Sequence, residues 1–302
     1  MTIRTLRQLC AAALTCMLAS CGSSGTTTEG AHSAASGTET TTASGPKAIV
    51  SLSPTATETL FAIGAGKQVI AVDDQSSFPT EAPRTDLSGF TPNVEAIVAK
   101  KPDLVVFADN AELAESLTKL GIPVLSQPAA ATIDDAYAQI AEIGKRSGHA
   151  AEATALVTSM RQRIDFAVRQ APKVALTYYH ELDDTLYSVT SKTFIGSVYA
   201  LFGLQNIADA ADKDATGYPQ LSAEYIAKAD PDLIFLADAK CCKQNPASIA
   251  ARPGFSGLKA VARNQILALD DDIPSRWGPR IADFAEIVSR KLAAFPVEVK
   301  AA

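Results

Sequence analysis

Two glutamates stand at matching places in a segment that the chain contains twice. The first copy, which starts at Val94, reads VEAIVAKKPDLVVFAD, and the second, which starts at Ala223, reads AEYIAKADPDLIFLAD. Both copies place an Ile two residues after the Glu, then Pro-Asp-Leu, and then Ala-Asp. A carboxylate acts by pairing with positive charge, so the first question is which positive charge Glu95 and Glu224 serve.

Each glutamate has a purely structural explanation. Asn93 and Ser222 lie two residues before them and can cap a helix, which puts Glu95 and Glu224 in the first helical turn. A carboxylate there stabilises its own helix through the positive end of the helix dipole. Because the pair recurs at matched places in two halves of the chain, we favour a functional role over helix stabilisation alone.

Histidines are too few and too dispersed for a zinc or manganese site, which brings several of them together. They are His32, His149 and His180. His180, in the stretch YYHELDD just past an expected strand, is either an axial or hydrogen-bonding group facing a ligand or an ordinary surface residue. We therefore expect no metal centre.

Two further catalytic or cofactor motifs are absent from the sequence. Ser51 and Ser53 have no G-x-S-x-G turn around them, so no hydrolase nucleophile can be read. Gly64 and Gly66 are followed by Val69 where a dinucleotide-binding loop has its third glycine. We therefore expect neither a hydrolase nucleophile nor a bound dinucleotide cofactor.

The N-terminal region is typical of an exported, lipid-anchored protein. Residues 1–20 combine early arginines with a short apolar run, as in a signal peptide, and LASC, ending at Cys21, resembles the bacterial lipobox. An ordinary secretory peptide that contains cysteine is the alternative. Residues 21–46 are rich in Ser, Thr and Gly, so we expect a disordered tether of roughly 25–30 Å.

The adjacent pair Cys241 and Cys242 contains the remaining thiols of the expected mature chain. Adjacent cysteines close only a strained ring. In an exported protein they form either a vicinal disulfide or two thiols that are reduced or paired with another molecule.

Length and charge describe a two-lobed acidic protein. About 250 residues remain after the tether, which suits two lobes. The net charge of −6 argues against a general nucleic-acid or anionic-membrane surface. No other apolar run is long enough to span a membrane.

The apolar pattern positions these residues on two similar α/β lobes. Continuous apolar strands alternate with helices in residues 47–147, and the pattern restarts in residues 172–302, which is typical of parallel sheets. Expected strands include residues 173–179 and 185–190. Residues 148–171 form one uninterrupted helical pattern that joins the lobes. The prediction is an α/β fold of two Rossmann-like lobes with a ligand cleft between them.

Four stretches carry a family resemblance: IVSLSPTATETLFAIGAG, VEAIVAKKPDLVVFAD, GYPQLSAEYIAKADPDLI and RWGPRIADFAEIV. With the tether, the lobes and the joining helix, they resemble the helical-backbone class (class III) of ABC-transporter substrate-binding lipoproteins. That family delivers ferric siderophores, haem or cobalamin. The resemblance covers residues 47–292, and its opening stretch followed by SSFP is most similar to the cobalamin-binding branch.

The resemblance implies roles for particular residues. In that family a glutamate on each lobe pairs with arginines of a dimeric permease, and the matching residues are Glu95 and Glu224. The cobalamin branch grips its ligand with aromatic residues, which Phe90, Tyr218 and Trp277 match. The other implied ligand-binding residues are Ser53, Gln75, Arg276 and Arg280.

Some of these positions differ from the family pattern or have a second explanation. Gln75 stands where an aromatic residue is expected, and Ala108 stands where cobalamin binders have a tryptophan. Arg276 and Arg280 would suit the carboxylates of a siderophore or of haem, although Arg280 equally suits a salt bridge at a helix start.

The resemblance therefore implies a monomeric, non-enzymatic protein on the outer face of the cell membrane. It would capture cobalamin or a related corrinoid and deliver it to an ABC permease dimer. A ferric-siderophore or haem binder of the same family is the first alternative. A two-lobed, chelatase-like enzyme and a surface interaction module with a vestigial cleft are the others.

Overall fold

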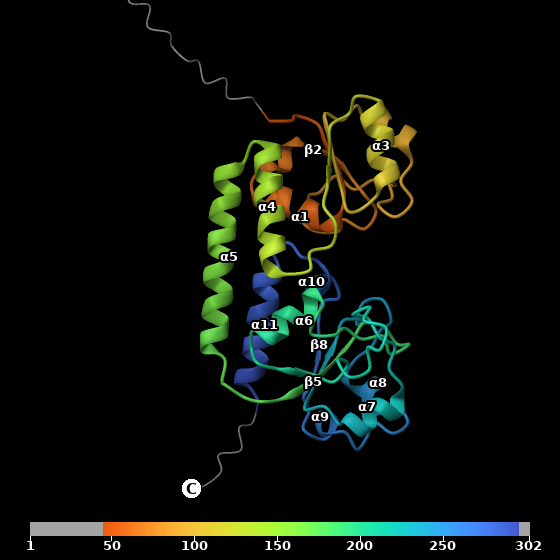
Figure 1. The fold of residues 1–302 in the computed structure, drawn as a ribbon, viewed down its shortest axis with the longest axis vertical. Coiled ribbons are helices and arrows are strands. Elements are labelled where there is room, and N and C mark those ends of the chain that lie inside the picture. The colour runs from red at the N-terminus through yellow and green to blue at the C-terminus, as the bar shows by residue number, and fades with distance from the viewer. Residues whose placement is uncertain (1–44, 296–302) are drawn as a thin grey trace, which may run out of the picture. The chain divides into compact units, whose positions relative to one another are not determined.

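The N-terminal lobe is built on a parallel sheet. The computed structural model describes residues 45–295 (Figure 1). This sheet has the order β2-β1-β3-β4 and consists of β1 (Ile49–Leu52), β2 (Val69–Val72), β3 (Leu104–Phe107) and β4 (Val124–Ser126). All residues of β1 and β3 are buried, because helices cover both faces of the central strands.

The C-terminal lobe repeats this arrangement. Its parallel sheet has the order β6-β5-β7-β8 and consists of β5 (Thr177–Glu181), β6 (Gln205–Asn206), β7 (Leu233–Leu236) and β8 (Ile266–Ala268). Each strand occupies the place of its counterpart in the first sheet. The two sheets confirm the predicted α/β fold of two similar lobes.

The helices follow the same division. Those before the second sheet are α1 (Pro54–Ala62), the short 3₁₀ helix η1 (Ala65–Gln68), α2 (Val94–Ala99), α3 (Ala111–Lys119), α4 (Ile133–Ser147) and α5 (Ala150–Gln170). Those after its first strand are α6 (Phe194–Ala200), α7 (Ala223–Ala229), α8 (Pro246–Ala250), α9 (Lys259–Ala262), α10 (Asp272–Ser275) and α11 (Ile281–Ala293). Among the described residues, none of these helices is long and apolar enough to cross a membrane.

Two of the strand predictions are corrected. The strand expected at residues 173–179 begins four residues later and ends two residues later, as β5, whose ladder with β7 pairs Tyr178 with Leu233 and Glu181 with Leu236. Residues 185–190 do not form a strand. They make an isolated antiparallel bridge, Tyr187 with Gln220, and the backbone N–H groups of Ser188 and Thr190 donate to carbonyl oxygens of the loop that leads to α7.

Helix α5 is the predicted bridge, but it does not act alone. Helix α4, which the sequence reading missed, runs beside it, and the final helix α11 also packs against it (Figure 1). A Cβ built at Gly144 of α4 would lie 2.3 Å from the Cβ of Ala153, so glycine lets α4 and α5 approach closely. The bridge is therefore a layer of three helices.

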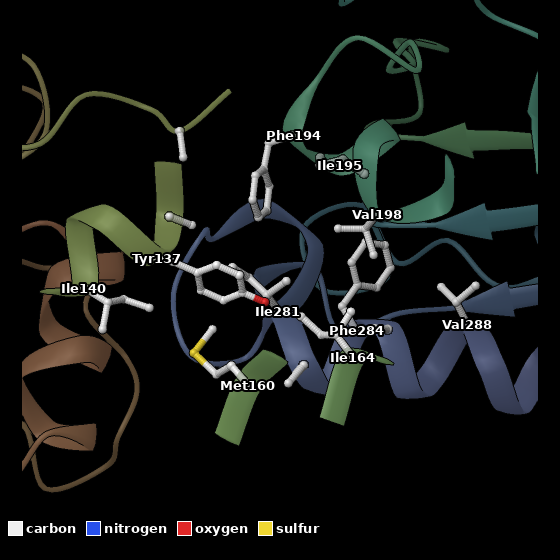
Figure 2. Close-up of a cluster of buried hydrophobic side chains, with 14 of the residues drawn as sticks. Tyr137, Ile140, Met160, Ile164, Phe194, Ile195, Val198, Ile281, Phe284 and Val288 are labelled. Carbon is white, nitrogen blue, oxygen red and sulfur yellow. The ribbon is translucent and has the colours of Figure 1, made fainter. Parts of the chain in front are cut away.

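One hydrophobic core runs through this layer into both lobes. Figure 2 shows Tyr137 and Ile140 from α4, Met160 and Ile164 from α5, Phe194, Ile195 and Val198 from α6, and Ile281, Phe284 and Val288 from α11. All of them are buried, and the same cluster includes residues of both sheets, such as Ile49 and Leu233. Relative movement of the lobes would have to disturb this core.

Candidate functional site

A cavity of about 540 Å³ opens where the N-terminal sheet ends. Cavities of this size are typical of small-molecule sites. Its walls come from the segments that follow β1, β2, β3 and β4 and from the turn before α11. The lining residues are Leu52, Ser53, Pro54, Thr55, Asp73, Gln75, Gly89, Phe90, Ala108, Asp109, Asn110, Ala129, Ser275, Arg276 and Trp277.

Two aromatic side chains line this cavity. The Phe90 side chain is 85% exposed and so has no packing partner that covers it. A Cβ built at the preceding Gly89 would lie 2.5 Å from the carbonyl oxygen of Leu52, so only glycine lets the Phe90 loop pass this close to β1. Trp277 is half-buried, and its Nε1 donates a 2.9 Å hydrogen bond to Oε1 of Gln139, which fixes the ring.

Asp73 places a carboxylate on the cavity wall directly after β2. The residue is 2% exposed, and its Oδ1 has no hydrogen-bond partner among the described residues. Burial raises the pKa of Asp73, although hydrogen bonding from Ser76 opposes the shift. A buried acceptor without a donor is costly unless something else supplies one.

Arg276 lines the cavity, but its charge is already paired with carboxylates of the protein. Its Nη1 donates to Oε1 of Glu58 at 2.8 Å, and its Nη2 donates to Oδ1 of Asp272 at 2.9 Å and to the carbonyl oxygen of Gln75 at 3.1 Å. The Glu58 side chain is 1% exposed and comes from α1, 218 residues away in the chain. This buried pair holds the turn before α11 against the N-terminal lobe.

Arg280 belongs to the same ion-pair network and does not line the cavity. Its Nε and Nη2 donate to the two carboxylate oxygens of Glu58, at 2.8 Å and 2.6 Å. Its guanidinium also lies 4.7 Å from the centre of the Phe78 ring. As the N-cap residue of α11, Arg280 makes the helix-start salt bridge that the sequence left open as an explanation.

The structure brings five of the seven expected ligand-binding residues to the cavity. They are Ser53, Gln75, Phe90, Arg276 and Trp277. Ser53 is also the N-cap of α1, where its side chain accepts a hydrogen bond from the backbone N–H of Ala56. Tyr218 is not among the lining residues; it lies 47% exposed in the loop before α7.

His180 requires a correction. The sequence placed it past a strand, facing either a ligand or solvent, but it lies within β5 and is fully buried. Its Nδ1 shares a 2.9 Å hydrogen bond with the hydroxyl of Tyr199, and burial lowers its pKa to about 3. His180 is a neutral residue of the core.

Sequence reasoning missed Asp73 and Glu58. Asp73 could have been found, because it directly follows an apolar strand and parallel strands carry functional side chains at their carboxyl ends. Glu58 gave no signal, because it is one of the buried positions of α1 and its partners lie more than 200 residues further along the chain.

Glu95 and Glu224 occupy equivalent positions in the two lobes. Each is exposed in the first turn of its helix, α2 or α7, which leads into the central strand β3 or β7. The side chains of Asn93 and Ser222 cap these helices at Ala96 N and Tyr225 N, at 3.0 Å and 3.1 Å. No salt bridge to either glutamate is found among the described residues.

The aspartates of the two Pro-Asp-Leu segments have a structural task. Asp103 accepts hydrogen bonds from the backbone N–H groups of Lys47 and Ala48, at 2.8 Å and 2.9 Å, just before β1. Asp232 accepts from the N–H of Thr177, the first residue of β5, at 3.0 Å. Each repeated unit therefore fastens the start of the neighbouring strand.

Cys241 and Cys242 lie in the loop after β7 as two separate thiols, one exposed and one half-buried. The backbone N–H of Cys241 donates to Asp271 at 3.0 Å. Beneath this loop Asp238 is fully buried, and neither of its carboxylate oxygens has a partner among the described residues. Burial, followed by the charge of Glu181, raises the pKa of Asp238 to about 8.

No group of three or more His, Cys, Asp or Glu side chains in residues 45–295 is arranged to hold a metal ion. The signal peptide, Cys21 and most of the expected tether lie outside the described residues.

Comparison with known proteins identifies relatives of most of this chain. A sequence model of the family described as "Periplasmic binding protein" matches residues 49–273. A cobalamin-binding protein of Halobacterium salinarum is 33% identical over 263 residues, which cover 82% of this chain and 70% of that protein. A Bacillus subtilis protein named "Uncharacterized ABC transporter substrate-binding lipoprotein YvrC" is 29% identical over 259 residues, 82% of this chain and 80% of that protein.

A solved structure shares the fold. The periplasmic vitamin B12 binding protein BtuF of Vibrio cholerae aligns with a TM-score of 0.66 and 25% identity, over 82% of this chain and 97% of that one.

Proposed function

Because the chain belongs to the periplasmic binding protein family, whose members bind solutes for ABC transport and are not enzymes, we propose that it captures cobalamin or a related corrinoid. The observation that carries this proposal is the cavity after β1, β2 and β3, with Phe90 and Trp277 on its walls. Aromatic rings stack on flat macrocycles and add about 0.5–1.5 kcal/mol beyond the area that they bury. The names of the Halobacterium salinarum and Vibrio cholerae relatives support the choice of ligand.

Delivery to a permease dimer is proposed for the two exposed glutamates. The repeated aspartates Asp103 and Asp232 are explained by contacts within the chain, whereas Glu95 and Glu224 form no ion pair with any of residues 45–295. Two exposed carboxylates at equivalent places suit a partner that presents the same cation twice. The dimeric ABC permease to which proteins of this family deliver their solutes would be such a partner.

We further propose that the protein works outside the cytoplasm as a monomer, anchored through Cys21 after removal of residues 1–20. The basis is the LASC sequence and the tether-like composition of residues 21–46. The Bacillus subtilis relative, which is named a lipoprotein, supports this anchoring.

Titration of the purified protein with cyanocobalamin, haemin and ferric siderophores tests the proposal. Trp277 is the one tryptophan of the chain, so quenching of its fluorescence reports on the cavity directly. We expect saturable quenching by cyanocobalamin. If haemin or a siderophore binds more tightly than cyanocobalamin, the assigned ligand is wrong but the proposed binding function stands. If none of them binds saturably, the protein does not capture such a chelate.

A further inference from the structure

A buried carboxylate removes positive charge from the ligand cavity. Glu58 accepts hydrogen bonds from both Arg276 and Arg280, and its side chain is 1% exposed. Arg276 also pairs with Asp272, which pairs in turn with Lys240 at 3.1 Å. Lys240 completes the set with a salt bridge to Asp270. The network thus contains three cations and three carboxylates, and its charges balance.

The lining of the cavity is left with negative charge. Its charged residues are Asp73, Asp109 and Arg276, and the charge of Arg276 is neutralised by Glu58 and Asp272. Oδ1 of Asp73 is an acceptor without a partner among the described residues. Such a wall suits a group that donates N–H hydrogen bonds, and it disfavours a second carboxylate, which would be desolvated without a free cation.

Flat metal chelates differ in this respect. A corrinoid carries neutral carboxamide side groups, whose N–H bonds can donate to Asp73. Haem and many siderophores carry carboxylates, which would need a free arginine or lysine. Resting on the proposed function, we infer that Glu58 sets the charge preference of the cavity. By holding Arg276 and Arg280, it makes the cavity select chelates with neutral carboxamides over chelates with free carboxylates.

The first test uses the unmodified protein and a matched pair of ligands. Cyanocobalamin is compared with its monocarboxylic acids, in which one propionamide has been hydrolysed to a carboxylate. We expect the acids to bind about tenfold more weakly, which corresponds to ~1.4 kcal/mol. Binding of both forms with equal affinity would overturn the inference alone, whereas failure of cyanocobalamin to bind would overturn the proposed function and the inference with it.

The second test changes the network. In Glu58→Gln one negative charge is lost and the arginines regain net charge, so the ratio of the two dissociation constants should fall towards one. Glu58→Asp keeps the charge and should keep the ratio. A ratio in Glu58→Gln that equals the wild-type ratio would refute the role of Glu58.

A third variant keeps the inference testable if Glu58→Gln does not fold. Asp73→Asn removes negative charge from the cavity wall and leaves the arginine network untouched. We expect it to reduce the penalty for the monocarboxylic acids severalfold. An unchanged penalty would mean that the charge of the wall does not govern selection, which would also overturn the inference.

Discussion

Asp103 and Asp232 fasten the starts of two different sheets in the same way, each by accepting hydrogen bonds from the backbone at the beginning of a neighbouring strand. The repeated segment is thus a structural unit that both lobes need. Its glutamates are exposed in both lobes and form no salt bridge among the described residues.

Charge reversal of Glu95 and Glu224 to Lys should abolish uptake and leave the soluble protein nearly unchanged. Exposed substitutions usually alter stability by no more than about 0.5 kcal/mol, so the melting temperature should stay close to that of the wild type. Repulsion from permease cations would prevent docking. Ligand affinity, melting temperature and uptake by cells are measured together.

A matched control is the double variant Glu152→Lys with Asp165→Lys, which makes the same change in net charge at two exposed positions of α5. It should transport normally. Normal uptake by the Glu95 and Glu224 double variant, accompanied by a lower melting temperature, would show that these glutamates only stabilise their helices.

Truncation of the cavity aromatics should weaken ligand binding. We expect Phe90→Ala and Trp277→Ala each to cost about 1–3 kcal/mol in cyanocobalamin affinity, because each removes a ring that can stack on the macrocycle. Tyr218→Ala is the comparison, since Tyr218 does not line the cavity. Calorimetric titration gives the three affinities, and a Tyr218→Ala loss as large as the other two would extend the site to the loop before α7.

Asp238→Asn should stabilise the protein at high pH. The pKa of Asp238 is raised to about 8 in the fold, so the folded protein holds a proton that the unfolded chain releases near its ordinary value of 3.8. The stability of the wild type therefore falls as the pH rises between these two values. Because Asn never ionises, the free energy of unfolding of Asp238→Asn should exceed that of the wild type by about 1–3 kcal/mol near pH 8. Near pH 4 the two should differ little.

The control for this prediction is Asp109→Asn. Asp109 ends the first copy of the repeat as Asp238 ends the second, but it is exposed. Thermal melts across the pH range should show no pH-dependent gain for Asp109→Asn. An equal gain in both variants would mean that burial of Asp238 is not the cause.

Cys241 and Cys242 should titrate as two free thiols per chain in protein that begins after Cys21 and is unfolded without reductant. In the folded protein Cys241 should react slowly despite its exposure, because desolvation and the neighbouring Cys242 raise its pKa to about 12 and leave little thiolate. Timed alkylation of folded and unfolded protein measures both effects. A titre of zero would mean that the pair is a vicinal disulfide.

The fold could be read from the sequence wherever the signal was local. The apolar strands, the two capped glutamate helices and the long helix α5 all follow from residue spacing within one segment. Helix α4 was missed even though Thr132 and Asp135 form a capping box at its start. That signal was available and the sequence reading did not use it.

The site could be read only in part, because its remaining determinants depend on distant pairing. The burial of His180 depends on the register of β5 against β7, which pairs it with Phe235. The neutralisation of Arg276 depends on Glu58, 218 residues earlier in the chain. Neither relationship has a periodic pattern that a single sequence could reveal.

The core that joins α4, α5, α6 and α11 has a practical consequence. Since one buried cluster contains residues of both sheets, the two lobes should lose their structure together, in a single cooperative melt. A ligand bound in the N-terminal cavity would then raise the melting temperature of the entire chain. The free energy of unfolding would rise by about 2.7 kcal/mol when the free ligand concentration is a hundred times the dissociation constant. Calorimetry could therefore rank colourless or unlabelled compounds that tryptophan fluorescence does not report.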